Sequence, residues 1–141
     1  MNSRVSPTVI GHRGASRDHP ENTVDAFVGA RQQGAGWVEL DVRRTADGAL
    51  VVLHDPQLPD GRAVAELAWA DVPGSVPTLR AALAASAPMG VNVEIKHGVG
   101  EPGFTEDRSL AEAVVAELAD APVEVLVSSF DLATIDRVRA L

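Results

Sequence analysis

Short apolar runs recur along the chain and are separated by segments with helical spacing or by loops. The clearest run, residues 37–43, places Val or Leu at alternate positions and charged side chains between them. Further runs lie at residues 9–10, 50–53, 91–96 and 123–127. Alternation with a period of two is typical of β-strands, so the pattern predicts five strands.

Helical patterns follow most of these runs. We expect helices over residues 23–33 and 106–120, another that begins at Thr78, and a last one capped by Asp131. Residues 56–77, which are rich in Pro and Gly, predict a loop with one helical turn near residues 63–70. Strands followed by helices imply parallel pairing with right-handed crossovers. The fold class is therefore α/β, and the pattern fits either an open sheet or part of a (β/α) barrel.

Polar residues gather within or at the ends of four predicted strands. These groups are His12-Arg13, Glu39 with Asp41, His54-Asp55, and Glu94 with Lys96. Ligands of α/β proteins bind at the carboxyl edge of the strands, so the four placements indicate one shared site.

Three of these side chains suit a cation. Glu39 and Asp41 share a strand face, and Glu94 lies opposite the apolar residues of its own strand. Clustered carboxylates repel one another, and oxygen ligands without cysteine suit Mg²⁺ or Ca²⁺; ordinary ion pairs are the alternative interpretation. The positive charges of Arg13 and Lys96 offset two of the three negative charges. A divalent ion would neutralise the carboxylates in their place and leave both basic side chains free to bind a phosphate.

His12 and His54 are the candidate acid and base. Two imidazoles can divide proton removal and proton delivery between them, and the pattern does not assign which does which. His19 and His97 are expected at solvated loop positions, while Phe130 fits pocket lining and core packing equally well.

Composition narrows the class of protein. With 12 basic and 20 acidic residues, the 141-residue chain has a net charge of −8, which argues against nucleic acid or an anionic membrane as the main partner. Its hydrophobic fraction of 45% argues against disorder. The segment Met1–Pro7 has no apolar core of a signal peptide, and no run approaches the ~18 apolar residues of a membrane span. We therefore expect no stable membrane insertion and a cytoplasmic location, unless a leader has been lost.

The motifs, taken in order, carry a family resemblance. The sequence resembles the glycerophosphodiester phosphodiesterases through Gly11-His12-Arg13-Gly14, Pro20-Glu21-Asn22-Thr23, Glu39-Leu40-Asp41-Val42, Thr45-Ala46-Asp47-Gly48, Val51-Val52-Leu53-His54-Asp55, Pro77-Thr78-Leu79, Val93-Glu94-Ile95-Lys96 and Ser128-Ser129-Phe130-Asp131. Each motif is weak alone, whereas the ordered series is specific.

The resemblance implies a TIM barrel that hydrolyses glycerophosphodiesters to glycerol 3-phosphate and an alcohol. The expected partner is therefore a small-molecule substrate. It further implies residue roles: acid/base catalysis by His12 and His54, a Ca²⁺ or Mg²⁺ site at Glu39, Asp41 and Glu94, phosphate binding by Arg13 and Lys96, and buttressing by Glu21 and Asn22.

The length qualifies this expectation. A complete (β/α)₈ barrel typically needs ~250 residues, so residues 1–141 are expected to form a single catalytic domain that is incomplete at its C-terminal side, with about five of eight strands. Open barrel edges favour self-association. Two alternatives stay open: a lysophospholipase D-like activity on acylated substrates, with an apolar wall from Leu58, Val64, Leu67 and Trp69, and an inactive fragment of the barrel.

Overall fold

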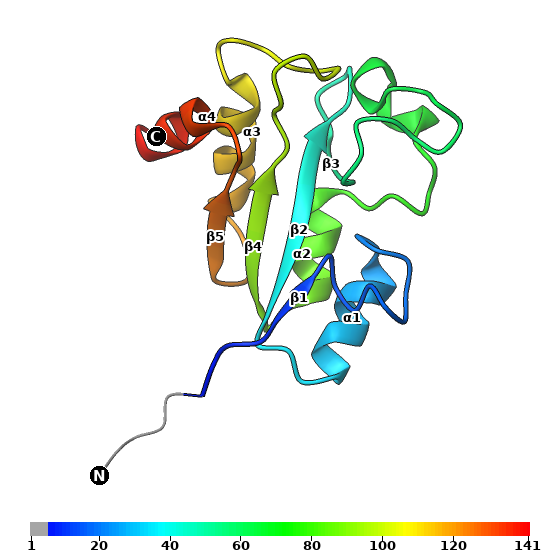
Figure 1. The fold of residues 1–141 in the computed structure, drawn as a ribbon, viewed down its shortest axis with the longest axis vertical. Coiled ribbons are helices and arrows are strands. Elements are labelled where there is room, and N and C mark those ends of the chain that lie inside the picture. The colour runs from blue at the N-terminus through cyan, green and yellow to red at the C-terminus, as the bar shows by residue number, and fades with distance from the viewer. Residues whose placement is uncertain (1–5) are drawn as a thin grey trace.

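A sheet with helices packed against one face dominates the computed structural model, which describes residues 6–141 (Figure 1). The predicted absence of a signal peptide rests partly on residues 1–5, which lie outside the described part of the chain. The strands are β1 (Ile10–His12), β2 (Trp37–Arg44), β3 (Leu50–Val52), β4 (Gly90–Ile95) and β5 (Val125–Ser128). The helices are α1 (Val24–Gln32), α2 (Leu79–Ser86), α3 (Ser109–Leu118) and α4 (Leu132–Arg139), with short 3₁₀ turns at η1 (Val64–Glu66) and η2 (Trp69–Asp71).

The sheet has the strand order β1-β2-β4-β5, and each neighbouring pair in that series is parallel. The central strand β2 pairs with β1 on one side and with β4 on the other. Its register places Asp41 directly beside Glu94. Carboxylates far apart in the sequence are therefore neighbours on the sheet.

The prediction that all five strands pair in parallel is wrong for β3, which runs antiparallel to β2. Residues 45–49 connect these two strands, and Thr45 Oγ1 accepts a hydrogen bond from the Ala49 N–H at 2.9 Å. A parallel crossover requires a dozen or more residues. A connection as short as residues 45–49 therefore permits only a hairpin.

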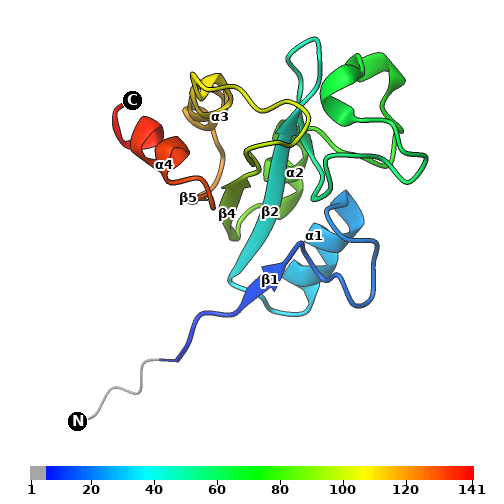
Figure 2. The same ribbon diagram turned by 45° about the horizontal axis from the view of Figure 1, so that its top comes forward.

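Alternation along β2 and β4 divides the sheet into an apolar and a polar face. Six residues of these strands form the apolar face and are at most 1% exposed: Val38, Leu40, Val42, Val91, Val93 and Ile95. They pack against helix residues such as Phe27, Leu79 and Val114. The opposite face carries Glu39, Asp41 and Glu94, as the period-two pattern predicted. Figure 2 shows α1 and α2 close to the sheet, with α3 and α4 side by side.

Side-chain caps begin three of the helices, and the Asp131 cap was predicted. The side chains of Thr23, Thr78 and Asp131 accept hydrogen bonds from the backbone N–H three residues onward, at 3.2, 3.1 and 3.1 Å. Helix α3 begins at Ser109, later than the expected residue 106, after Arg108 in the left-handed region at φ +54°. Local capping chemistry thus places most helix starts correctly.

The segment between β3 and α2 forms a small second core. Its buried members are Leu58, Val64, Val72 and Val76, together with Val51 of β3. Of the four residues considered as an apolar wall for acylated substrates, Leu58 and Val64 are only 4% and 1% exposed and do not supply it, whereas Trp69 is 37% exposed. Among residues 6–141, we find no helix with the length and apolar character needed to cross a membrane.

Candidate active site

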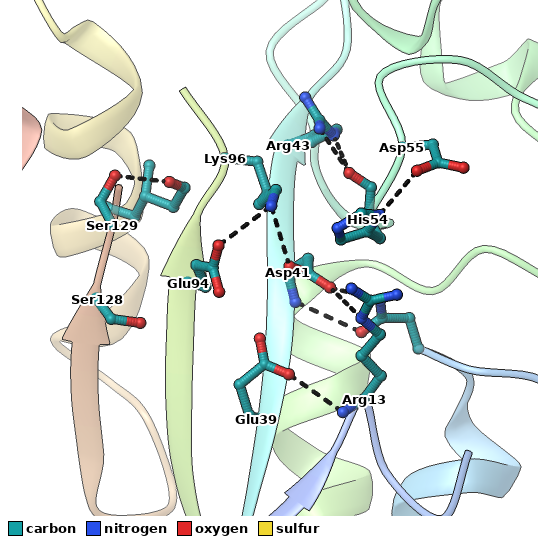
Figure 3. A network of polar contacts seen from close by, with 12 residues as sticks. Arg13, Glu39, Asp41, Arg43, His54, Asp55, Glu94, Lys96, Ser128 and Ser129 are labelled. Atoms are coloured by element: carbon teal, nitrogen blue, oxygen red, sulfur yellow. Dashed lines mark hydrogen bonds and ion pairs between the residues drawn. The ribbon is translucent and has the colours of Figure 1, made fainter. Parts of the chain in front are cut away.

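Three carboxylates converge at one place on the polar face of the sheet. Glu39 and Asp41 project from β2 and Glu94 projects from β4, and each offers an oxygen within 4.8 Å of the others (Figure 3). Glu39 and Asp41 are 6% and 1% exposed. The predicted acidic cluster is therefore assembled, and it is largely buried.

Glu39 is the least satisfied member of this cluster. Its Oε2 accepts a hydrogen bond from the Arg13 backbone N–H at 3.1 Å, whereas its Oε1 is buried without a hydrogen-bond partner. Burial, followed by the negative charge of Asp41, raises the pKa of Glu39 to about 7. A bound cation would satisfy the orphaned oxygen and offset the repulsion, so the donor set fits a divalent metal ion.

Two basic side chains partly neutralise the carboxylates. Lys96 Nζ lies 3.1 Å from Glu94 Oε1 and 3.8 Å from Asp41 Oδ1. Arg13 Nε lies 3.3 Å from Asp41 Oδ2. Because two positive charges face three carboxylates, the cluster has one net negative charge when all three carboxylates are ionised, as the sequence predicted.

The loop between β1 and α1 supports this arrangement. Asn22, at φ +58° and 3% exposed, donates from Nδ2 to Asp41 Oδ2 at 2.9 Å. Arg13 Nη1 pairs with Glu21 Oε2 at 3.0 Å. These contacts agree with the buttressing that the resemblance implied for Glu21 and Asn22. Gly14 lets the loop approach α1, because a Cβ there would lie 2.6 Å from the Ala26 backbone.

His12 lies beside the acidic cluster. It ends β1, where the register places it next to Glu39, and its Nε2 is 3.7 Å from Glu39 Oε2. Its side chain is 71% exposed. The imidazole is therefore accessible from solvent while touching the edge of the carboxylate cluster.

His54 reaches this region by a different route from the one expected. It follows β3, and because β3 turns back along β2, the preceding residue donates its N–H to the Asp41 carbonyl at 3.0 Å. The antiparallel return, and not a parallel strand end, brings His54 to the level of Asp41. Within the described part of the chain, the His54 side chain makes no hydrogen bond or ion pair with the three carboxylates.

The partner of the His54 ring is Asp55. Nδ1 of His54 lies 2.7 Å from Asp55 Oδ1. A carboxylate oxygen can only accept, so Nδ1 carries the hydrogen and a neutral ring keeps its lone pair on Nε2. This arrangement makes Nε2 the atom of His54 that can accept a proton.

A cavity of about 350 Å³ opens beside Lys96. It is lined by residues of β4, of the following loop and of the segment after β5, including Glu94, Lys96, Val99, Glu101, Ser129 and Phe130. Phe130 is 90% exposed, and Lys96 Nζ lies 5.8 Å from the centre of its ring. Of the two interpretations of Phe130, pocket lining is the one that holds.

The prediction of a solvated His97 is wrong. His97 is 5% exposed, its Nε2 accepts from the Thr105 N–H at 2.9 Å, and its Nδ1 lies 3.3 Å from Thr134 Oγ1. Burial lowers its pKa, which favours the neutral ring. Through these contacts His97 connects the loop that follows β4 with helix α4, and its role is structural.

Asp131 anchors the same region and gives a testable pH dependence. Hydrogen bonds from Arg108 and Thr134 lower its pKa to about 2, so its stabilisation is complete above the unfolded-state value near 3.9 and is lost as the pH falls toward 2. We expect Asp131→Asn to lower the free energy of unfolding by about 2 kcal/mol at pH 7 and by progressively less below pH 4. Denaturant unfolding between pH 7 and pH 3 measures this difference. The exposed Asp136→Asn serves as the control, and a deficit that is the same at both pH values would contradict the assignment.

Two further residues of this region were not singled out from the sequence. Arg43 lies on the strand face of Glu39 and Asp41, so its alternating position was a usable signal. Glu101, in the loop after β4, pairs with Arg43 at 3.0 Å, and no local pattern indicated this contact.

Residues 12–141 match the model of a protein family described as the glycerophosphoryl diester phosphodiesterase family. A glycerophosphodiester phosphodiesterase of *Caldanaerobacter subterraneus* is 57% identical over 47 residues, which cover 33% of this chain and 19% of that protein. A probable glycerophosphodiester phosphodiesterase 2 of *Mycobacterium tuberculosis* is 40% identical over 99 residues, which cover 62% of this chain and 38% of that protein.

Solved structures extend the similarity to nearly the whole chain. A glycerophosphodiester phosphodiesterase from *Thermotoga maritima* has a TM-score of 0.82 at 31% identity, with 95% of this chain and 58% of that chain covered. An *Oleispira antarctica* phosphodiesterase in complex with the product sn-glycerol-3-phosphate has a TM-score of 0.85 at 30% identity, with 96% and 62% covered. The chain thus spans about three fifths of these structures, and its fold is part of a TIM barrel.

Proposed function

The chain belongs to the glycerophosphoryl diester phosphodiesterase family, and from this premise we propose that its acidic cluster supports metal-dependent hydrolysis of glycerophosphodiesters to glycerol 3-phosphate and an alcohol. The observation that carries the proposal is the orphaned Glu39 Oε1 among three convergent carboxylates. The relatives' names support the reaction class, and the product bound to the *Oleispira* enzyme supports glycerol 3-phosphate as a product.

Charge favours an anionic substrate only when the carboxylates hold a cation. Glu39, Asp41 and Glu94 contribute three negative charges against the two positive charges of Arg13 and Lys96. A bound divalent cation would turn this sum to +1, polarise a phosphoryl oxygen and stabilise the charge that develops in the transition state. We assign this cation to Mg²⁺ or Ca²⁺, since all the donors are carboxylate oxygens.

Arg13 and Lys96 are the proposed phosphate-binding residues. Both side chains form ion pairs with carboxylates of the cluster. A phosphate that they bind is therefore held next to the proposed metal ligands. Arg13 presents a planar fork that suits two phosphoryl oxygens, whereas Lys96 acts as a compact charge. Together they fix the phosphorus atom relative to the two histidines.

His12 and His54 are the proposed acid and base. One accepts a proton from the nucleophile, either water or the neighbouring glycerol hydroxyl, as the new oxygen–phosphorus bond forms. Attack by water gives glycerol 3-phosphate directly, whereas attack by the hydroxyl gives a cyclic phosphate that a water molecule must then open. The other donates a proton to the leaving alkoxide as its bond to phosphorus breaks. The Nδ1–H bond to Asp55 leaves Nε2 of His54 free to accept a proton, and the ring can donate one there only after Nε2 has been protonated.

Two substrates distinguish the main proposal from the lysophospholipase D-like alternative. We expect the chain, supplied with Mg²⁺ or Ca²⁺, to release glycerol 3-phosphate from glycerophosphocholine faster than it cleaves lysophosphatidylcholine. The reason is the burial of Leu58 and Val64, which leaves only Leu67 and Trp69 of the four residues considered for an acyl-chain wall. Preference for the acylated substrate would favour the alternative, and failure to cleave either would favour the inactive fragment.

Open strand edges support self-association. The flanks β1 and β5 have no outer neighbour within residues 6–141, and Ile10 and Leu126 on them are 49% and 55% exposed. Unpaired apolar edges of this kind pair with other chains. We expect sedimentation velocity to show species larger than the monomer as concentration rises. A single monomeric species at all concentrations would contradict this expectation.

A further inference from the structure

Arg43 shares a strand face with Glu39 and Asp41 but serves a different group. Its side chain is 7% exposed. The Nε and Nη2 atoms both donate to the carbonyl oxygen of His54, Nε at 2.9 Å (Figure 3). The Nη1 atom donates to Glu101 Oε2 at 3.0 Å. The guanidinium therefore links the loop after β4 to the backbone at His54.

The bonded carbonyl belongs to the peptide group between His54 and Asp55. The orientation of that peptide determines where the Asp55 carboxylate lies relative to the His54 ring, because the two residues are adjacent. Their contact, 2.7 Å between Nδ1 and Oδ1, therefore depends on the plane that Arg43 fixes.

We propose that Arg43, oriented by Glu101, is a positioning residue that holds His54 in its Nδ1–H tautomer with Nε2 free. The relevance of this clamp to catalysis rests on the function proposed above. Glu101 also lines the cavity beside Lys96, so the clamp couples that cavity to His54. A ligand that displaces Glu101 would loosen Arg43 and, through it, the histidine.

An arginine is required for this task. Its planar fork donates two N–H groups to one carbonyl oxygen while a third reaches Glu101, and the ammonium group of lysine cannot reproduce that fixed geometry. Arg44, the next residue, offers a matched control. It donates from Nη2 to Ser109 Oγ at 3.0 Å, and so it contacts α3 and not His54.

The test is the tautomer of the His54 ring, read by long-range ¹H–¹⁵N NMR on the full chain at pH 8. The His54 signals are assigned by their loss in His54→Gln. We expect the wild type and Arg44→Lys to show the Nδ1–H tautomer alone, and Arg43→Lys to show a mixture with the Nε2–H form. Glu101→Gln, at a half-exposed position, is expected to show a smaller admixture and keeps the test valid if Arg43→Lys does not fold.

This readout needs no turnover, so failure of the clamp and failure of the proposed activity are separate results. An unchanged His54 tautomer in both Arg43→Lys and Glu101→Gln would overturn the clamp. Where the chain is active, Arg43→Lys should lower kcat by about 10–100-fold, by analogy with residues that orient metal ligands, with little change in KM. Equal losses in Arg44→Lys would also overturn it.

Discussion

Replacing Glu39 with Gln is expected to abolish divalent-metal binding while making the metal-free chain more stable. The substitution removes a ligand and also the buried carboxylate whose pKa is raised to about 7 by burial and by Asp41. A carboxyl group with a raised pKa destabilises the fold wherever it is ionised, so above pH 7 the gain in the free energy of unfolding should be about 1–3 kcal/mol. Turnover should fall by about 10³-fold, because a lost metal forfeits several kcal/mol of transition-state stabilisation.

Thermal unfolding with and without Mg²⁺ or Ca²⁺ measures the stability part of this prediction. Metal at about 100 times its dissociation constant should stabilise the wild type by about 2.7 kcal/mol and leave Glu39→Gln unaffected. The exposed Glu66→Gln is the matched control, expected to behave as the wild type. A Glu39→Gln variant that still gains stability from metal, or that is less stable than the wild type without it, would contradict the assignment.

Replacing His54 with Ala is expected to lower turnover by about 10²–10⁴-fold, the usual contribution of a positioned acid or base. Because the proposed role is proton transfer, the loss should appear in kcat at saturating metal, with KM changed little. His54 is partly exposed, so the variant should fold with nearly wild-type stability. Release of glycerol 3-phosphate from glycerophosphocholine at fixed metal concentration is the measurement.

His19→Ala is the matched control for His54→Ala. His19 packs against Gly29 of α1 and makes no polar contact with the acidic cluster among the described residues. It should retain turnover within about twofold of the wild type, since it touches no group placed in the reaction. Equal activity in His54→Ala and His19→Ala would remove His54 from the mechanism.

Much of the sheet and of the acidic cluster could be predicted because both depend on strand periodicity. Alternation along residues 37–43 placed Glu39 and Asp41 on one face, and the same rule placed Glu94 on the corresponding face of its strand. Parallel strands with helical crossovers then brought those faces together. Each of these steps uses local pattern and general topology only.

The direction of β3 was missed, although the chain carries a signal for it. Periodicity shows that residues 50–53 form a strand but not which way the strand runs. Asp47-Gly48 between two apolar strands is a strong hairpin signal, and the connection is too short for a helix. The hairpin matters for the site, since it carries His54 back to the level of Asp41.

Contacts between distant segments account for the other differences. His97 is buried because Thr105 and Thr134 close over it from a later loop and helix. Arg43 acquires its role only when the hairpin presents the His54 carbonyl and a distant loop presents Glu101. The residue spacing within one segment cannot predict these contacts, because they arise from the packing of the whole sheet.

Metal removal and restoration tests the central claim most directly. The chain is treated with a chelator, assayed for release of glycerol 3-phosphate from glycerophosphocholine, and assayed again after Mg²⁺ or Ca²⁺ is added in excess. We predict that chelation abolishes release and that one of the two ions restores it, because three carboxylates with an orphaned oxygen require a cation before an anionic substrate can bind. Release that continues undiminished in the chelator would contradict the proposed metal site.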